Sequence, residues 1–146
     1  MSIIYIGIGT NLGNKAKNLK QAINLLEKHV GKCHKISSFY ASKPFGFDSE
    51  NDFLNAVVEI ETCILPFELL RETQEIEYEI GRTKKSVNGI YQDRIIDIDI
   101  LLYDNEIIDT PELKIPHPHI AERDFVLIPL KEIAPETAKK FTAAHF

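Results

Sequence analysis

The segment DRIIDIDILLYD, residues 93–104, constrains the fold more than any other part of the chain. Its even-numbered positions form an unbroken apolar row of Ile96, Ile98, Ile100 and Leu102. A period of two is typical of a β-strand that buries one face, so Asp97 and Asp99 must share the opposite face. The segment therefore predicts a strand with one apolar face and one acidic face.

The acidic pair needs an explanation of its own. Asp is depleted in strands, and two like charges on one face repel, so the pair requires a compensating cation. Residues two apart in a strand are separated by roughly 6.5 to 7 Å, which lets both carboxylates turn onto one or two hard cations. Mg²⁺ ions that bridge the phosphates of a nucleotide would meet this need. The alternative is an acidic face open to water, with Arg94 and nearby lysines as partners.

Basic residues gather around the acidic pair in the sequence. They are Arg82, Lys84, Lys85 and Arg94, in or beside a polar loop at 82–93, and His117 and Arg123 in a proline-rich segment. A structureless loop of this length in a small domain is usually functional or disordered, and we expect a mobile lid. Because phosphoryl transfer depends on cationic clamps and alignment, the cluster favours a polyphosphate ligand. Taken singly, each residue also fits a structural role, such as a cation at a helix C-terminus.

Hydrophobic periodicity predicts the remaining elements. We expect strands at 3–8, 33–41 and 53–61, and helices at 17–30 and from Pro66 to Ile80. Gly31 and Gly81 stand where these helices are expected to end. The buried stripes would be Leu19, Ala22, Ile23, Leu26 and Val30 in the first helix, and Leu69, Thr73, Ile76 and Ile80 in the second. A last strand or short helix is expected near 125–133.

The order of these elements is strand, helix, strand, strand, helix, strand. It predicts an α+β, ferredoxin-like fold, with an antiparallel-rich sheet, helices packed on one face and the other face open. In the strand at 53–61 the even positions would face the helices, which leaves Phe53 and Asn55 on the open face with Asp97 and Asp99. We expect the site there, in one domain spanning residues 1–146.

Other features exclude several classes of protein. GIGTNLGN, residues 7–14, matches neither a complete P-loop nor a complete dinucleotide fingerprint, and we interpret it as a turn. The chain has 17 basic and 22 acidic residues, and its net charge of -5 argues against binding to a nucleic-acid backbone. The N-terminal residues predict neither a signal peptide nor a membrane span, so we expect a cytoplasmic protein. Cys33 and Cys63 are isolated, which disfavours a zinc site or a disulfide.

Several segments in one order carry a family resemblance: SSFYASKPFG, FLNAVVEIET, the helix with Gln74 and Glu77, DRIIDIDILLYD and IPHPHIAERDF. Together they resemble the 6-hydroxymethyl-7,8-dihydropterin pyrophosphokinases of folate biosynthesis, over about residues 3–135. The most specific element is Arg-x-x-Asp-hydrophobic-Asp-hydrophobic-hydrophobic, which begins at Arg94. The resemblance implies a ferredoxin-like fold, two Mg²⁺ ions, and transfer of pyrophosphate from ATP to the pterin with release of AMP.

The resemblance also implies roles for individual residues. Asp97 and Asp99 match the metal-holding pair, which acts with Arg82 and Arg94 in catalysis. The positions that match ATP contacts are Gln74, Glu77, Arg82, Lys84, Lys85, Arg94, His117 and Arg123. The positions that match the pterin site are Ser42, Lys43, Pro44, Phe45, Phe53, Asn55, Tyr91, Asp97 and Phe125, with Phe53 and Phe125 on either side of the flat ring.

This chain departs from the family pattern in its lid. Gln92-Asp93 stands where many members have Gly-Pro, and Tyr91 is the nearest match to a frequent tryptophan. We expect an in-line attack by the pterin hydroxyl on the β-phosphorus of ATP, with Asp97 as an acceptor for the hydroxyl proton. We also expect a monomer, and leave open an association with neighbouring folate-pathway enzymes. The rival hypothesis is a catalytically silent binding module of the same topology.

Overall fold

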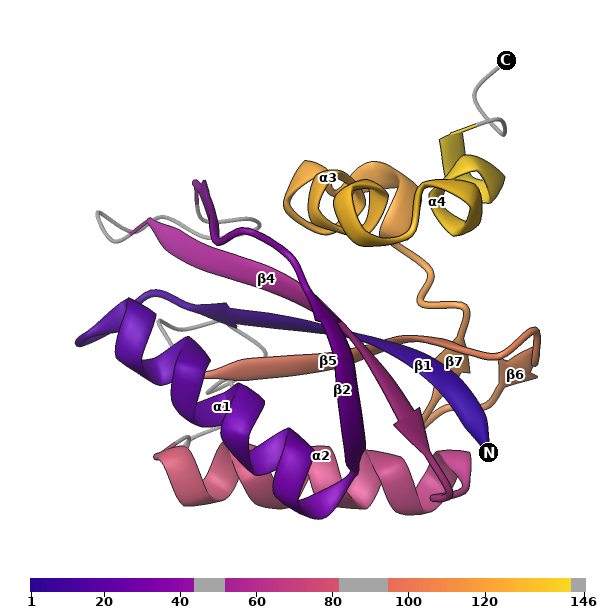
Figure 1. The fold of residues 1–146 in the computed structure, drawn as a ribbon, viewed down its shortest axis with the longest axis horizontal. Coiled ribbons are helices and arrows are strands. Elements are labelled where there is room, and N and C mark those ends of the chain that lie inside the picture. The colour runs from indigo at the N-terminus through magenta and orange to yellow at the C-terminus, as the bar shows by residue number, and fades with distance from the viewer. Residues whose placement is uncertain (44–51, 82–94, 143–146) are drawn as a thin grey trace.

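The computed structural model describes residues 1–43, 52–81 and 95–142, and these residues contain one large sheet and one small one. In the large sheet, β2 (Gly31–Ile36), β4 (Phe53–Thr62), β1 (Ser2–Thr10) and β5 (Asp97–Tyr103) lie in that order, and β3 (Tyr40–Ser42) pairs with β4. All of these pairs are antiparallel. Together with the helices, this sheet confirms the predicted α+β class (Figure 1).

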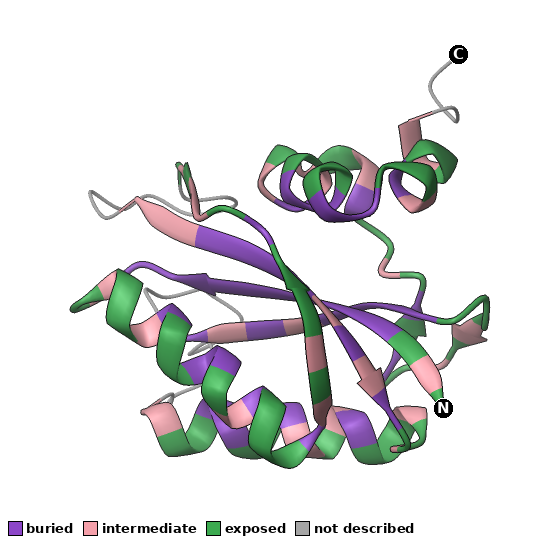
Figure 2. Cartoon of the chain, in the orientation of Figure 1, coloured by how far each residue is buried: buried purple, intermediate pink, exposed green. Residues whose placement is uncertain are grey.

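Two helices cover one face of the sheet. They are α1 (Lys15–His29) and α2 (Pro66–Ile80), and they lie side by side below the sheet in Figure 1. The larger core cluster lies between them and the sheet and includes Ile6, Val58 and Ile98 from three neighbouring strands. The stripe predicted for α1 is buried throughout, which fits the buried inner side of that helix in Figure 2. Of the four residues predicted for the stripe of α2, three are buried and Ile80 is partly exposed. Hydrophobic periodicity in the sequence therefore predicted these buried helix positions correctly.

The opposite face is not left open, so the prediction of helices on one face only is wrong. Helices α3 (Asp124–Ile133) and α4 (Pro135–Thr142) lie over it (Figure 1). A second core cluster joins them to the sheet, with Tyr5, Val57 and Leu101 from the strands and Val126 and Leu130 from α3. The expected element near 125–133 is therefore a helix, and it covers part of the face that we expected to be bare.

A β-bulge in β5 explains part of this error. The pairing of β1 with β5 shifts between Tyr5 and Ile6, which face Leu102 and Ile100 respectively. The extra residue turns Leu101 and Leu102 onto the same face, so Leu102 joins the second cluster instead of the row that contains Ile100. A strict period of two cannot predict this change, because the bulge depends on pairing with β1.

Local signals explain the helix ends. The side chain of Asn14 caps α1 by accepting a hydrogen bond from the backbone N–H of Lys17 at 3.1 Å. Pro66 occupies the first turn of α2, and Gly81 follows it with φ of +125°, as predicted. Helix α1 ends at His29 with Val30 as its C-cap, so Gly31 directly follows the helix end, as predicted. Gly31 also opens β2, where a Cβ atom would overlap the carbonyl oxygen of Glu61.

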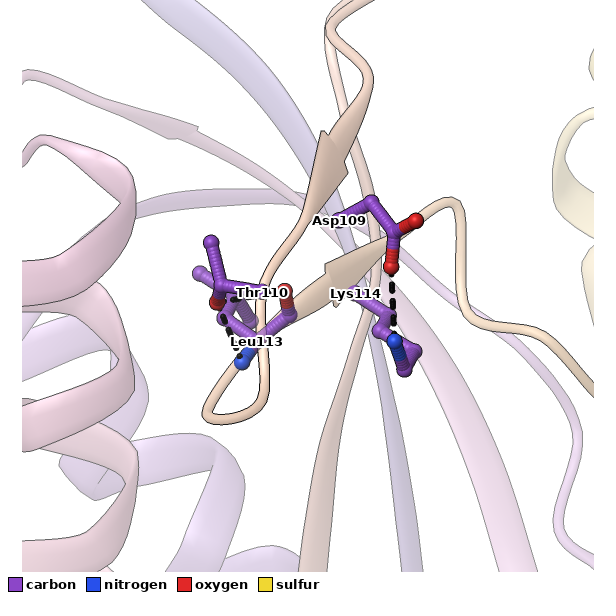
Figure 3. A network of polar contacts seen from close by, with 4 residues as sticks. All are labelled: Asp109, Thr110, Leu113 and Lys114. Carbon is purple, nitrogen blue, oxygen red and sulfur yellow. Dashed lines mark hydrogen bonds and ion pairs between the residues drawn. The ribbon is translucent and has the colours of Figure 1, made fainter.

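The segment after β5 forms a small hairpin that the sequence did not predict. β6 (Ile108–Asp109) pairs with β7 (Lys114–Ile115), and Figure 3 shows the contacts that hold it. The hydroxyl of Thr110 bonds to the backbone of Leu113, and Lys114 Nζ donates to Asp109 Oδ1 at 2.6 Å. A 3-10 turn (Ile120–Glu122) then leads into α3. In the part of the chain that the structure describes, no helix has the length and apolarity needed to cross a membrane.

Candidate active site

Strand pairing brings two predicted site residues, Asn55 and Asp97, to one row across the sheet. Gly9 of β1 lies opposite Asn55 on one side and opposite Asp97 on the other. The next row on this face runs from Val57 through Gly7 to Asp99. Residues directly opposite one another in antiparallel strands share a face, so the two aspartates and Asn55 project from the same side. The predicted common face of Asp97 and Asp99 is confirmed.

The two glycines in these rows belong to β1, so the interpretation of residues 7–14 as a turn was wrong for residues 7–10. The turn follows, and Asn18 Nδ2 steadies it by donating to the carbonyl of Leu12 at 2.9 Å and to Thr10 Oγ1 at 3.2 Å. Glycine inside a strand often marks a place where another group approaches the backbone closely. Gly7 and Gly9 stand two residues apart, so the sequence itself indicated two such positions on one face of the strand.

The side-chain amide of Asn55 is held in one orientation. Its Nδ2 donates to the carbonyl oxygen of Tyr40 at 2.9 Å and to Ser42 Oγ at 2.8 Å. Both amide hydrogens are therefore used within the protein, and Oδ1 is the atom that can accept a hydrogen bond from a ligand. Asn55 and Ser42, which the sequence predicted separately, form one polar unit between β3 and β4.

The two phenylalanines predicted for the pterin site come from different elements. Phe53 begins β4, two residues before Asn55, and Phe125 lies in the first turn of α3. Both rings are partly buried, and Phe125 packs against the cluster that joins α3 to the sheet. The guanidinium carbon of Arg123 lies 5.8 Å from the centre of the Phe125 ring, within the range of a cation–π contact. The structure thus places a predicted pterin residue next to a predicted ATP residue.

Glu77 has a role that the sequence did not predict. It is only 6% exposed, and its Oε2 accepts a hydrogen bond from the backbone N–H of Ile98 at 2.7 Å. Within the described residues β5 lies at an edge of the sheet, where this N–H has no strand partner. Glu77 therefore clamps the backbone between Asp97 and Asp99. Gln74, one turn earlier on α2 and also predicted to contact ATP, is exposed, whereas Glu77 is buried.

His117 is fixed to β5 through its backbone. Its N–H donates to the carbonyl of Leu101 at 2.9 Å, and its ring Nδ1 accepts from the backbone N–H of His119 at 3.2 Å. Burial, followed by the positive charges of Arg123 and His119, lowers the pKa of His117 to about 4, although Asp97 acts in the opposite direction. The ring is therefore neutral near pH 7, with its proton on Nε2 as a hydrogen-bond donor.

A surface pocket of about 260 Å³ lies between β5, α2 and the β6–β7 hairpin. Its lining residues are Leu70, Ile98, Asp99, Ile100, Pro111, Glu112, Leu113, Lys114, His117 and Pro118. His117 was predicted to contact ATP and Asp99 to hold Mg²⁺, and both line this pocket. Glu112 and Lys114 also line the pocket, although neither was a candidate from the sequence. The only signal for them was a proline-rich segment directly after the acidic strand.

The remaining predicted site residues cannot all be placed. Lys43 is exposed, with Nζ 3.9 Å from Asp52 Oδ1. The other predictions fall on Pro44, Phe45, Arg82, Lys84, Lys85, Tyr91 and Arg94, and these lie outside the described residues, as does the expected lid. Those assignments stay predictions.

The donor set on the acidic strand fits magnesium. Among the described residues, no three His, Cys, Asp or Glu side chains gather into a group that could hold a metal. Two carboxylates on one face remain, and Mg²⁺ commonly binds through one or two carboxylates, with water and substrate phosphates as its other ligands. A site made of Asp97 and Asp99 would therefore need a phosphate ligand to be complete.

Comparison with known proteins agrees with this arrangement. The family model described as 7,8-dihydro-6-hydroxymethylpterin-pyrophosphokinase (HPPK) matches residues 5–135. The chain belongs to this family. An HPPK of Porphyromonas gingivalis is 46% identical over 136 residues, which cover 92% of each chain. One from Bacillus subtilis is 44% identical over 145 residues, which cover 99% of this chain and 85% of the relative.

Solved structures show the same fold at lower identity. A crystal structure of HPPK-DHPS in complex with substrates has a TM-score of 0.74 and 17% identity. Wild-type HPPK-DHPS of Plasmodium falciparum with SDX-DHP also has a TM-score of 0.74, with 18% identity. Each match covers 99% of this chain but only 43% and 44% of the solved chains, respectively. This chain therefore corresponds to less than half of those longer proteins.

Proposed function

We propose that this chain transfers pyrophosphate from ATP to the hydroxyl of 6-hydroxymethyl-7,8-dihydropterin, giving the pterin pyrophosphate and AMP in folate biosynthesis. The observation that carries the proposal is the family match over residues 5–135, joined to a site in which Asn55 and Asp97 share one row of the sheet. An amide that can hydrogen-bond a heterocycle and a carboxylate that can hold a phosphate-bound metal ion then lie on the same face.

The pterin would bind in a slot formed by Phe53, Asn55 and Phe125, which we call the pterin slot. A flat, hydrogen-bonding ring system suits aromatic walls with a fixed amide at its edge. Asn55 Oδ1 would accept an N–H of the ring, because Tyr40 and Ser42 occupy the donor side of the amide. Ser42 and Lys43 would complete the described part of this site, with Pro44, Phe45 and Tyr91 as further predicted contacts.

ATP would bind on the other side of the acidic strand. The pocket lined by Asp99 and His117 supports this placement, since the neutral ring of His117 can donate from Nε2 to an oxygen of the nucleotide. Arg123 would add a positive charge between the nucleotide and the pterin slot, because its guanidinium lies against Phe125. Gln74, Glu77, Arg82, Lys84, Lys85 and Arg94 stay as predicted nucleotide contacts.

Asp97 and Asp99 would hold two Mg²⁺ ions, which when bound neutralise the oxygens of the phosphate chain. The clamp from Glu77 would keep the backbone between the two carboxylates fixed while substrates enter and leave. The hydroxyl oxygen of the pterin attacks the β-phosphorus, the bond from that phosphorus to the α,β-bridging oxygen breaks, and AMP leaves. Asp97 would accept the hydroxyl proton. Closure of the predicted lid at 82–93 would exclude water as a competing nucleophile.

We further propose that residues 1–146 form a single ferredoxin-like domain. The order β2–β4–β1–β5, with antiparallel pairing and two crossover helices on one face, supports this topology. Both core clusters pack on the same sheet, which supports one domain. The monomeric state, the cytoplasmic location and an association with other folate-pathway enzymes stay predictions from the sequence.

One assay separates the proposal from its rivals. The chain is incubated with ATP, Mg²⁺ and the hydroxymethyl dihydropterin, and the nucleotide product is identified by chromatography. Accumulation of AMP with an equal amount of pterin pyrophosphate supports pyrophosphoryl transfer. ADP would indicate a different kinase, and measurable pterin binding without turnover would favour the silent binding module. A parallel reaction in which EDTA replaces free Mg²⁺ tests the metal requirement.

A further inference from the structure

The glycine pair in β1 was interpreted as part of a turn, and the proposed mechanism does not use it. Gly7 and Gly9 project toward the same face as Asn55 and Asp97, but their surroundings differ. A Cβ atom on Gly9 would lie 3.0 Å from Asn55 Oδ1 and 3.6 Å from Phe53 Cδ1. The three heavy atoms nearest to a Cβ atom on Gly7 would all belong to the side chain of Leu101, the closest at the ordinary contact distance of 3.5 Å.

We infer that Gly9 is a positioning residue for the pterin slot: the absence of a side chain there lets the Asn55 carbonyl and the Phe53 ring settle onto β1. This inference rests on the proposed function, since it concerns the slot assigned to the pterin. Gly9 is itself buried beneath these two side chains, so it acts through them and not by direct contact with substrate. Its role is to determine where the acceptor atom of Asn55 stands.

The Asn55 amide cannot easily move away from an added methyl group. A rotation that carried Oδ1 away from Gly9 would also move Nδ2, which donates to the Tyr40 carbonyl and to Ser42 Oγ. Breaking those bonds would leave buried polar groups without partners, because Asn55 is only 4% exposed. Gly9→Ala would therefore change the orientation of the Asn55 amide and the position of the Phe53 ring. The pocket lined by Asp99 and His117 lies beyond β5 from Gly9, so we expect it to change little.

The test compares Gly9→Ala with Gly7→Ala, the same substitution on the same strand and face. Affinities for the hydroxymethyl dihydropterin and for a non-hydrolysable ATP analogue are measured by calorimetry with Mg²⁺ present. For Gly9→Ala we expect roughly tenfold or greater loss of pterin affinity, the equivalent of one disturbed hydrogen bond to a buried group. Affinity for the ATP analogue should be retained, and Gly7→Ala should retain both affinities. In ¹⁵N spectra the side-chain amide signals of Asn55 should shift in Gly9→Ala but not in Gly7→Ala.

The outcomes distinguish the inference from the function. Normal pterin affinity in Gly9→Ala would overturn the inference alone, and so would an equal loss of both ligands in a folded variant. Wild-type protein that neither binds the pterin nor forms AMP would overturn the proposed function together with the inference. If Gly9→Ala does not fold, a structure of the wild type with pterin decides: we expect Asn55 Oδ1 to accept a ring N–H at about 2.7 to 3.2 Å. A pterin that leaves Oδ1 without this contact would overturn the inference.

Discussion

The two faces of the sheet are built from alternate residues of the same strands, yet one is apolar and the other carries polar side chains. Toward α1 and α2, the strands β1, β4 and β5 contribute Ile8, Ala56 and Ile98, which are at most 6% exposed. Toward the other face the next residues along are Gly9, Asn55 and Asp97. The first face carries the larger apolar cluster, whereas the second holds these polar groups beside the apolar cluster under α3 and α4.

This difference shows how a small domain can carry a polar site without a large loss of stability. Leu26, Leu69 and Ile60 are fully buried in the larger cluster, and burial of side chains of this size contributes about 1.5 to 3 kcal/mol each. The second face can then hold acidic and amide groups that pack poorly in an apolar core. We call the face toward α1 and α2 the stabilising face, and the face that carries Asn55 and Asp97, with its proposed site, the functional face. Each of the following predictions tests whether the two faces have separate roles.

The largest effect is expected from Asp97→Ala. Loss of a carboxylate that organises the phosphate charge should lower the rate of AMP formation by roughly 10²- to 10³-fold or more, with little change in the urea midpoint. The matched control is Glu61→Gln, a carboxylate on the same face of the sheet that is paired with His34 at 2.8 Å, far from the site. Near-normal turnover in Asp97→Ala would contradict the metal-binding role that we propose for the acidic strand.

Leu26→Ala tests the opposite face. Leu26 is fully buried in the cluster beneath α1, so its truncation should lower the free energy of unfolding by about 2 to 5 kcal/mol. Urea denaturation followed by circular dichroism measures this loss, with the exposed Lys28→Ala as the control on the same helix. Where the variant remains folded, its KM for pterin should match the wild type. A large change in that KM would contradict the proposed separation of the two faces.

A smaller effect is expected where α3 is fastened over the functional face. Both carboxylate oxygens of Glu132 accept from the backbone N–H of Ser38 at 3.0 Å, and Oε2 also accepts from Ser38 Oγ at 2.9 Å. Since α3 carries Phe125, Glu132→Ala should weaken pterin binding more than ATP binding and lower stability by about 1 kcal/mol. Paired KM measurements check this, with Lys131→Ala as the neighbouring control. Equal changes in both KM values would argue against an anchoring role.

The last prediction concerns the pH dependence of stability. The pKa of His117 is lowered to about 4 in the folded chain, against an ordinary value of 6.5. Between these values the unfolded chain binds a proton that the folded ring does not, so this residue makes stability fall as pH decreases from 6.5 toward 4. Its contribution is complete above pH 6.5.

Thermal unfolding of the ligand-free chain from pH 7.5 to 4 would measure this dependence. We expect a weaker loss of stability in acid for His117→Gln than for the wild type. His29→Gln, at the exposed end of α1, should retain the wild-type profile. If His117→Gln loses as much stability between pH 6.5 and 4 as the wild type, groups other than His117 cause that loss.

Much of the fold could be predicted from local patterns. The stripe from Leu19 to Val30 and the alternation from Leu54 to Ile60 each depend only on the period of one element, and both faces are where they were expected. Pro66 and Gly81 mark the ends of α2 by backbone restrictions that act within a single turn. The acidic face of β5 followed from the same reasoning, and so did the common side of Asn55 and Asp97.

The sequence by itself therefore determined the helix stripes and strand faces of the larger core cluster, which strand is acidic and which family the chain resembles, because each depends on short-range periodicity or on motif order. Tertiary structure alone decided that α3 covers the second face, that Leu102 leaves its row at the bulge, and that Glu77 is buried as a clamp on Ile98. It also decided that Gly9 lies beneath Asn55. The physical reason is that each of these contacts joins residues from different elements, and only strand register and helix packing determine which groups then meet.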